Sequence, residues 1–220
     1  MGKNKLARFK ESESFPRFFQ YKYQDIINHR FPYKGKWHEE VFKNSNPITL
    51  EVGCGRAEYT TGLARQNPDK NYIGIDRKGA RLWRGGKTMV EENLINVAFI
   101  RTNIDFINFF FEKNEVDEIW LTFPDPQPKR EKRRLTHPFY LEKYKSFLKP
   151  GAVIHLKTDS LELHLWTKEI LEQNRHPVYD SSLDIYKDGL MGPVTEIKTT
   201  YEKKFLAEGK TITYLKFGLK

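Results

Sequence analysis

The chain has 220 residues, enough for one domain with a sizeable core, and its single cysteine excludes an internal disulfide and any cysteine-based zinc cluster. The formal net charge of +9 favours a polyanionic partner, nucleic acid first and an acidic membrane second. No apolar run reaches the roughly 18 residues that a membrane-spanning helix needs, and the amino terminus lacks the apolar segment of a signal peptide. The histidines show no metal-ligand spacing. We therefore expect a cytoplasmic protein with no membrane segment and no metal.

Residues 1–46 are interpreted as a basic and aromatic extension ahead of a domain that spans residues 47–220. In the extension, cations such as Arg8 and Lys10 are interleaved with aromatic residues such as Phe9 and Phe15. We expect the aromatic side chains to pack on the domain and the cations to face solvent. Disorder of the first dozen residues fits the same composition.

Apolar, strand-like runs alternate with helical segments from residue 47 onwards. The expected strands are 48–53, 72–76, 97–101, 116–123, 152–158, 197–200 and 211–219. The expected helices are 59–66, 77–92, 104–111, 138–148 and 161–173. This alternation is typical of an α/β fold with a mostly parallel sheet and helices on both faces. The last two strands have no clear helix between them, which predicts an antiparallel hairpin at one edge.

A polar residue stands at or just after the end of five expected strands. These residues are Glu51, Asp76, Asn103, Asp125 and Asp159. Because ligands of open parallel sheets bind outside the carboxyl ends of the strands, we expect the site at this edge.

The segment Glu51-x-Gly53-x-Gly55 follows a strand and precedes a helix. Glycines there allow a tight turn and close approach of the backbone to a ligand, and Asp76 can accept hydrogen bonds from two ribose hydroxyls. The pattern indicates a nucleoside-containing cofactor. Glu58 stands where a dinucleotide-binding loop has its third glycine. The carboxylates of Glu51 and Glu58 would repel a pyrophosphate and attract a cation, which favours S-adenosylmethionine as the cofactor. A structural turn with an incidental acid is the alternative.

Residues 120–134 pass from a buried strand into a proline-rich segment that holds Asp125, and then into a basic run. The run comprises Lys129, Arg130, Lys132, Arg133 and Arg134. Prolines fix the backbone around the carboxylate, and the adjacent cations favour contact with RNA phosphates over a merely solvated loop. A second set of cations recurs at helical spacing: Arg77, Arg81, Arg84 and Lys87. For this stripe a solvated helix face is the favoured interpretation.

Five motifs together resemble the bacterial tRNA (guanine-N7-)-methyltransferase family. They are EVGCGRAEYT at 51–60, YIGID at 72–76, IWLTFPDPQPKREKRRLT at 119–136, HLKTDS at 155–160 and TTYE at 199–202. The resemblance implies a Rossmann-like class I methyltransferase with a seven-stranded sheet whose last two strands form the edge hairpin. It further implies methyl transfer from S-adenosylmethionine to N7 of a guanosine in the variable loop of tRNA, by a monomer or a homodimer.

The resemblance also assigns positions in this chain. The cofactor-binding positions are Glu51, Asp76, Asn103 and Asp125, beside the loop glycines Gly53 and Gly55. The substrate-binding positions are Lys129, Asp159, Thr199, Thr200, Tyr201 and Glu202. Tyr201 could stack on a base or pack on an edge strand.

Guanine N7 carries an in-plane lone pair and no proton, so its methylation needs no general base. We expect catalysis by positioning, with a carboxylate that orients the ring and stabilises the charge developing on it. Asp125 is the first candidate for that catalytic carboxylate, and Asp159 is the second.

Three residues depart from the family pattern: Asp76 stands for Glu, Asn103 for Asp, and Gln127 for Trp. Other functions remain open. A methyltransferase for an exocyclic amine would be expected to carry an aromatic residue after its Pro-Pro, and a nicotinamide dehydrogenase would need the third glycine. A non-catalytic RNA-binding module on a degenerate methyltransferase fold would bind no cofactor.

Overall fold

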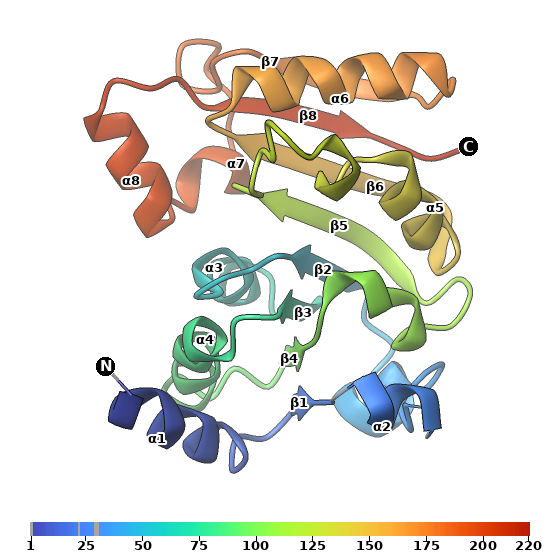
Figure 1. Ribbon diagram of the computed structural model, residues 1–220, viewed down its shortest axis with the longest axis vertical. Coiled ribbons are helices and arrows are strands. Elements are labelled where there is room, and N and C mark those ends of the chain that lie inside the picture. Colours follow the sequence, from blue (N-terminus) through green and yellow to red (C-terminus); the bar gives the residue numbers. More distant parts are fainter. Residues whose placement is uncertain (1, 22, 29–30) are drawn as a thin grey trace.

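The computed structural model describes residues 2–21, 23–28 and 31–220 and folds them around one central sheet (Figure 1). The strands are β1 (Phe18–Gln20), β2 (Ile48–Val52), β3 (Asn71–Asp76), β4 (Val97–Arg101), β5 (Val116–Thr122), β6 (Leu148–Thr158), β7 (Val178–Ser182) and β8 (Thr213–Phe217). The α-helices are α1 (Gly2–Ser12), α2 (Tyr23–Asn28), α3 (Glu58–Gln66), α4 (Gly79–Glu91), α5 (Pro138–Lys145), α6 (Leu161–Gln173), α7 (Pro193–Glu196) and α8 (Thr200–Ala207). A π-helical turn η1 (Trp37–Phe42) and two 3₁₀ segments, η2 (Ile104–Phe109) and η3 (Glu131–Arg133), complete these elements.

The sheet has the strand order β1-β4-β3-β2-β5-β6-β8-β7. Strands β1 to β6 pair in parallel, whereas β8 runs antiparallel to both β6 and β7 (Figure 1). The mostly parallel sheet and the antiparallel edge hairpin are confirmed. The expected count of seven strands is wrong, because the amino-terminal segment adds β1 beside β4 and makes eight.

Helices cover both faces of the sheet, as expected, and each face has its own apolar core. Along β4 the side chains alternate: Ala98 and Ile100 enter one core, while Val97 and Phe99 enter the other. The first core includes side chains of α5, α6, η1 and η2, and the second includes side chains of α3, α4 and α7. This alternation follows from the two-residue period of a strand that is buried on both faces.

The expected strand at 197–200 is wrong. Pro193 starts the short helix α7, and α8 begins at Thr200. The reason is a helix-start signal: Thr199 is the N-cap of α8 and its hydroxyl accepts a hydrogen bond from the Glu202 N–H at 3.1 Å. The hairpin partner of β8 is instead β7, whose polar and largely exposed sequence carries little strand periodicity.

The amino-terminal segment contacts the rest of the chain through side chains. Trp83 of α4 donates to Glu11 of α1 at 2.7 Å, and Phe18 packs 5.9 Å from the Phe99 ring. None of the helices in the described part of the chain is long and apolar enough to cross a membrane.

Candidate functional site

After β2 the chain adds β3 and β4 on one side, and it then crosses over to place β5 on the other side of β2. The order of the strands therefore changes direction between β2 and β5. Such a switch point places the carboxyl ends of the two strands at the mouth of a ligand crevice. Glu51 lies there at the end of β2, with 3% of its surface exposed. It accepts hydrogen bonds from Thr122 of β5 and from the hydroxyl and N–H of Thr60 on α3. Glu51 therefore joins both strand ends to the helix that follows the glycine loop.

Burial changes the acid strength of Glu51. Removal of the carboxylate from water raises its pKa to about 7, although the hydrogen bonds from Thr122 and Thr60 act in the opposite direction. A cation placed beside this group would favour its ionised form. The carboxyl is therefore suited to a positively charged ligand.

The glycine loop after β2 turns through left-handed backbone conformations. Gly53 has φ +83° and Gly55 has φ +57°, and a Cβ on Gly55 would meet no atom within 4 Å. Asp76 at the end of β3 accepts from the Gly55 N–H at 2.9 Å and from the Lys78 N–H at 2.6 Å. Each of its oxygens keeps a free lone pair on a partly exposed side chain. This open loop and carboxylate fit a nucleoside whose ribose hydroxyls donate to Asp76.

Asn103 follows β4 at the same edge. Its side chain is exposed and donates to Asp105 at 2.9 Å, and Asp105 in turn accepts from the Tyr140 hydroxyl at 2.8 Å. The Thr102 N–H donates to the Asp76 carbonyl at 3.2 Å. The structure therefore brings Asn103 to the strand end next to Asp76.

The proline-rich segment leaves β5 with two residues in the left-handed region, Phe123 at φ +48° and Gln127 at φ +45°. Such conformations are costly for residues other than glycine and often occur at functional sites. Between them lies the exposed Asp125, whose carboxylate accepts from the Gln127 N–H at 3.1 Å. The carboxylate is fixed in direction and open to solvent, as a group that orients a substrate should be.

The buried side chain of Arg134 holds the proline-rich segment in place. Its Nε donates to the Pro126 carbonyl at 3.0 Å, a terminal nitrogen donates to Glu162, and the guanidinium lies 4.7 Å from the centre of the Trp166 ring. Only 1% of Arg134 is exposed. In this structure the Arg134 guanidinium is engaged inside the protein and is not presented to solvent, and its assignment to RNA phosphates stays a prediction.

The other four cations of the run are exposed, as a phosphate-binding loop requires. Lys129, Arg130, Lys132 and Arg133 line a hollow of about 610 Å³ together with Pro128 and Glu131. We call these four cations the basic loop.

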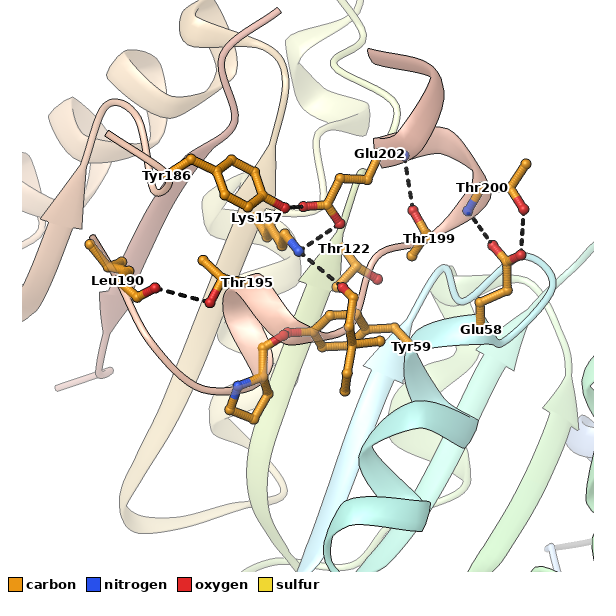
Figure 2. A network of polar contacts seen from close by, with 12 residues as sticks. Glu58, Tyr59, Thr122, Lys157, Tyr186, Leu190, Thr195, Thr199, Thr200 and Glu202 are labelled. Atoms are coloured by element: carbon orange, nitrogen blue, oxygen red, sulfur yellow. Dashed lines mark hydrogen bonds and ion pairs between the residues drawn. The ribbon is translucent and has the colours of Figure 1, made fainter. Parts of the chain in front are cut away.

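The segment that leads into α8 is held by a buried ion pair (Figure 2). Lys157 Nζ lies 2.7 Å from Glu202 Oε2 and donates to the Ile197 carbonyl at 3.3 Å, while the Tyr186 hydroxyl donates to Glu202 at 2.6 Å. Both charged side chains have no exposed surface. The Glu202 carboxylate is thus fully engaged inside the protein in this structure, and its assignment to the substrate stays a prediction.

The other members of the 199–202 motif point in different directions. Thr199 caps α8, and both the N–H and the hydroxyl of Thr200 donate to Glu58 at the start of α3 (Figure 2). Tyr201 is 43% exposed and lies on a helix rather than on the expected edge strand. Glu58 therefore ties α8 to the cofactor loop.

Asp159 follows β6 and pairs with Lys210 at 3.2 Å. It thus stands at the same edge as Asp125, because the Phe123 N–H donates to the Lys157 carbonyl at 2.8 Å and joins the ends of β5 and β6. Sequence reasoning did not single out Lys157. The available signal was a lysine inside the apolar run of a central strand, where a charge needs a buried partner.

The comparisons with known proteins agree with this geometry. Residues 45–215 match a family described as "Putative methyltransferase". The chain is 52% identical over 221 residues to the tRNA (guanine-N(7)-)-methyltransferase of Christiangramia forsetii, with 99% of each chain covered. It is 49% identical over 219 residues to the protein of that name from Bacteroides fragilis, with 100% of this chain and 87% of the relative covered.

A solved structure supports the fold. The crystal structure of a SAM dependent methyltransferase from Aquifex aeolicus aligns with a TM-score of 0.56 at 16% identity, over 90% of this chain and 98% of that chain. The sheet order, the loop after β2 and the carboxylates at the strand ends are thus those of a Rossmann-like class I methyltransferase. On the family match and the near full-length identity, the chain belongs to the tRNA (guanine-N(7)-)-methyltransferase family.

Proposed function

We propose that this protein transfers a methyl group from S-adenosylmethionine to N7 of a guanosine in the variable loop of tRNA. The observation that carries the proposal is the placement of the rigid, exposed Asp125 at the same sheet edge as the glycine loop, with the basic loop beside it. The names of the relatives given above support tRNA as the substrate and N7 of guanine as the methylated atom. We assign the activity to the cytoplasm, with a monomer or a homodimer as the active form.

The cofactor is assigned to the loop between β2 and α3. Gly53 and Gly55 let the backbone approach it, and Asp76 accepts from its ribose, with Asn103 beside the adjacent strand end. The buried carboxyl of Glu51 favours its positive charge. When bound, S-adenosylmethionine would supply an electrophilic methyl group: the N7 lone pair would form the new N–C bond while the C–S bond breaks and its electron pair stays on the sulfur of S-adenosylhomocysteine, so no base is needed.

The protein's own contribution is position and charge. Asp125 accepts hydrogen bonds from the Watson–Crick edge of the guanine and so orients the ring toward the cofactor loop. As positive charge develops on the ring, the same carboxylate stabilises it, because it is already fixed by the Gln127 N–H and needs no reorganisation. Asp159 follows β6 at this edge and Tyr201 is exposed on α8, and both are assigned to the substrate.

The basic loop holds the RNA backbone. Lys129, Arg130, Lys132 and Arg133 are exposed and follow the proline segment directly, so phosphates bound to them would place the target base near Asp125. These contacts carry no sequence information and serve to set register.

One experiment tests the proposal. The purified protein is incubated with radiolabelled S-adenosylmethionine and tRNA made without modifications, and the digested nucleosides are separated. The expected label is in 7-methylguanosine alone. Label in an adenosine or on the exocyclic amine of guanosine would contradict the proposal, and absence of cofactor binding in calorimetry would identify a non-catalytic RNA-binding module.

A further inference from the structure

A second basic hollow lies beside the cofactor loop, on the helical face formed by α3 and α4. Its volume is about 740 Å³. Small side chains lie in its lining, among them Thr61, Ala80 and Thr88, while α1 and the segment around Ile197 contribute to its rim. We call it the α3–α4 groove.

Close packing builds the groove's two sides. A Cβ on Gly62 of α3 would lie 2.7 Å from Ile197 Cγ2, so the glycine allows the segment before α8 to lie directly on the helix. On the other side, the Arg8 guanidinium of α1 lies 4.6 Å from the centre of the Trp83 ring of α4. The hollow therefore depends on contacts between elements far apart in sequence.

The carboxylates in the groove are already engaged. Glu92 is held by Arg65 at 2.5 Å, Glu58 accepts from Thr200, and Glu196 accepts from Gln66 at 3.2 Å.

Besides Arg8, which lies on the Trp83 ring, three cations of the lining are not paired with a carboxylate among the described residues. Arg56, Arg81 and Lys198 are exposed, and within the described residues no carboxylate forms an ion pair with any of them. Instead the Arg81 guanidinium lies 5.9 Å from the Tyr201 ring centre and Lys198 Nζ lies 4.8 Å from that of Tyr186. The groove thus offers positive charge with unused hydrogen-bond donors.

The helical stripe of cations divides in the structure. Arg84 lies 3.7 Å from Glu91 and Lys87 lies 2.8 Å from Glu11, so these two are neutralised locally, as a solvated helix face would be. Arg81 is not neutralised and faces the groove. At this position the structure therefore also allows a contact with a ligand in the groove.

The groove is continuous with the site. Arg56 follows Gly55 of the cofactor loop, and Glu58 connects the groove lining to α8 through Thr200. We propose that the α3–α4 groove binds the sugar–phosphate backbone of the same RNA substrate, on a surface separate from the basic loop. This inference rests on the proposed function, because it takes that substrate as its occupant. Arginines with free donors are suited to phosphate oxygens, and the hollow is far larger than one phosphate group.

The test compares a double variant, Arg81→Gln and Lys198→Gln, with a control double variant, Lys113→Gln and Lys145→Gln, which removes the same number of charges. The control positions are exposed and lie before the amino ends of β5 and β6, at the opposite edge of the sheet. Binding of unmodified tRNA is followed by fluorescence anisotropy at several salt concentrations, and cofactor binding by calorimetry. The double variant should lose at least fivefold in tRNA affinity at low salt, and its slope of log affinity against log salt should fall by roughly 1.4–1.8, at 0.7–0.9 for each lost phosphate contact. The control should keep the wild-type slope, and both variants should bind S-adenosylmethionine within twofold of wild type.

The inference is overturned if the double variant Arg81→Gln/Lys198→Gln keeps the tRNA affinity and salt slope of the control. It is also overturned if polyglutamate competes with tRNA for the wild-type groove as well as unlabelled tRNA does, since the surface would then suit an acidic protein. Failure of the proposed function has a different signature: wild-type protein that binds tRNA with the expected slope yet produces no 7-methylguanosine.

Discussion

Lys157 of β6 and Glu202 of α8 form an ion pair in which neither side chain has exposed surface, with 2.7 Å between Nζ and Oε2. The pair is completed by the Ile197 carbonyl and the Tyr186 hydroxyl. It connects a central strand to the segment that reaches the cofactor loop through Glu58. Asp159 follows the same strand, and the Phe123 N–H donates to the Lys157 carbonyl. The ion pair therefore supports the strand ends that carry Asp125 and Asp159.

Removal of one partner of this pair should destabilise the protein strongly. Lys157→Met or Glu202→Gln leaves a buried group without its partner, and we expect each to lower the free energy of unfolding by roughly 3–5 kcal/mol. Tyr186→Phe removes one hydrogen bond and should lower it by about 1–3 kcal/mol. Urea unfolding followed by circular dichroism measures all three. The double variant Lys157→Met/Glu202→Leu should recover part of the loss, and single variants as stable as wild type would contradict the assignment.

Glu51 should make the ligand-free protein lose stability as pH rises. Its pKa in the folded chain is about 7 because of burial, above the ordinary value of 4.5. A carboxyl with a raised pKa contributes stability that is fully present below about pH 4.5 and is lost as pH rises through about 7, by roughly 2–4 kcal/mol. Urea unfolding between pH 4.5 and 8 measures this loss. In Glu51→Gln, which cannot ionise, that component should be absent; parallel curves for the two proteins would show that Glu51 is not its source.

Cofactor binding should release a proton from Glu51. A cationic ligand favours the ionised carboxylate and so lowers the pKa of Glu51 in the complex. At pH 6 to 7 the affinity for S-adenosylmethionine should therefore rise with pH. Calorimetry in two buffers with different ionisation enthalpies gives the number of protons released, which should be a sizeable fraction of one. Glu51→Gln should release none, and equal release by both proteins would refute the assignment.

Arg134 and Arg133 are neighbours in sequence but should behave differently when replaced. Arg134 is buried and holds the Pro126 carbonyl, so Arg134→Lys should misplace Asp125 and lower the rate of methyl transfer at saturating tRNA by about tenfold or more. The salt dependence of tRNA binding by the Arg134→Lys variant should be that of wild type. Arg133→Gln should reverse the pattern, with a salt slope lower by about 0.7–0.9 and an unchanged saturating rate. If both variants show the same pattern, the division between anchor and phosphate contact is wrong.

The parallel core of the sheet was predictable from sequence because β2 to β6 are apolar runs separated by turn residues and helical segments. β1 was not predictable, since three residues of an aromatic stretch become a strand only by pairing with β4. β7 is polar and gains its strand conformation from β8. The start of α8 could have been predicted from Thr199 and Glu202, which have the spacing of a helix-capping pair. It was missed because the neighbouring residues favour a strand.

The candidate site was predictable where it depends on strand ends, since the switch-point rule selects Glu51, Asp76 and Asp125. It was not predictable where it depends on partners distant in sequence. Arg134 reads as one more cation of a basic run until Glu162 and Trp166 of α6 are seen around it. The same holds for Glu202, whose role follows from Lys157, 45 positions earlier.

The most direct measurement maps the methylated position in tRNA for wild type and for Asp125→Ala. Unmodified tRNA is treated with enzyme and S-adenosylmethionine, and 7-methylguanosine is located by chemical cleavage at that nucleoside. We predict one modified guanosine, in the variable loop, for wild type, and none for Asp125→Ala, with unfolding of the variant within about 1 kcal/mol of wild type because the side chain is exposed. A methyl group at another nucleoside, or full activity of a normally folded Asp125→Ala protein, would contradict this account.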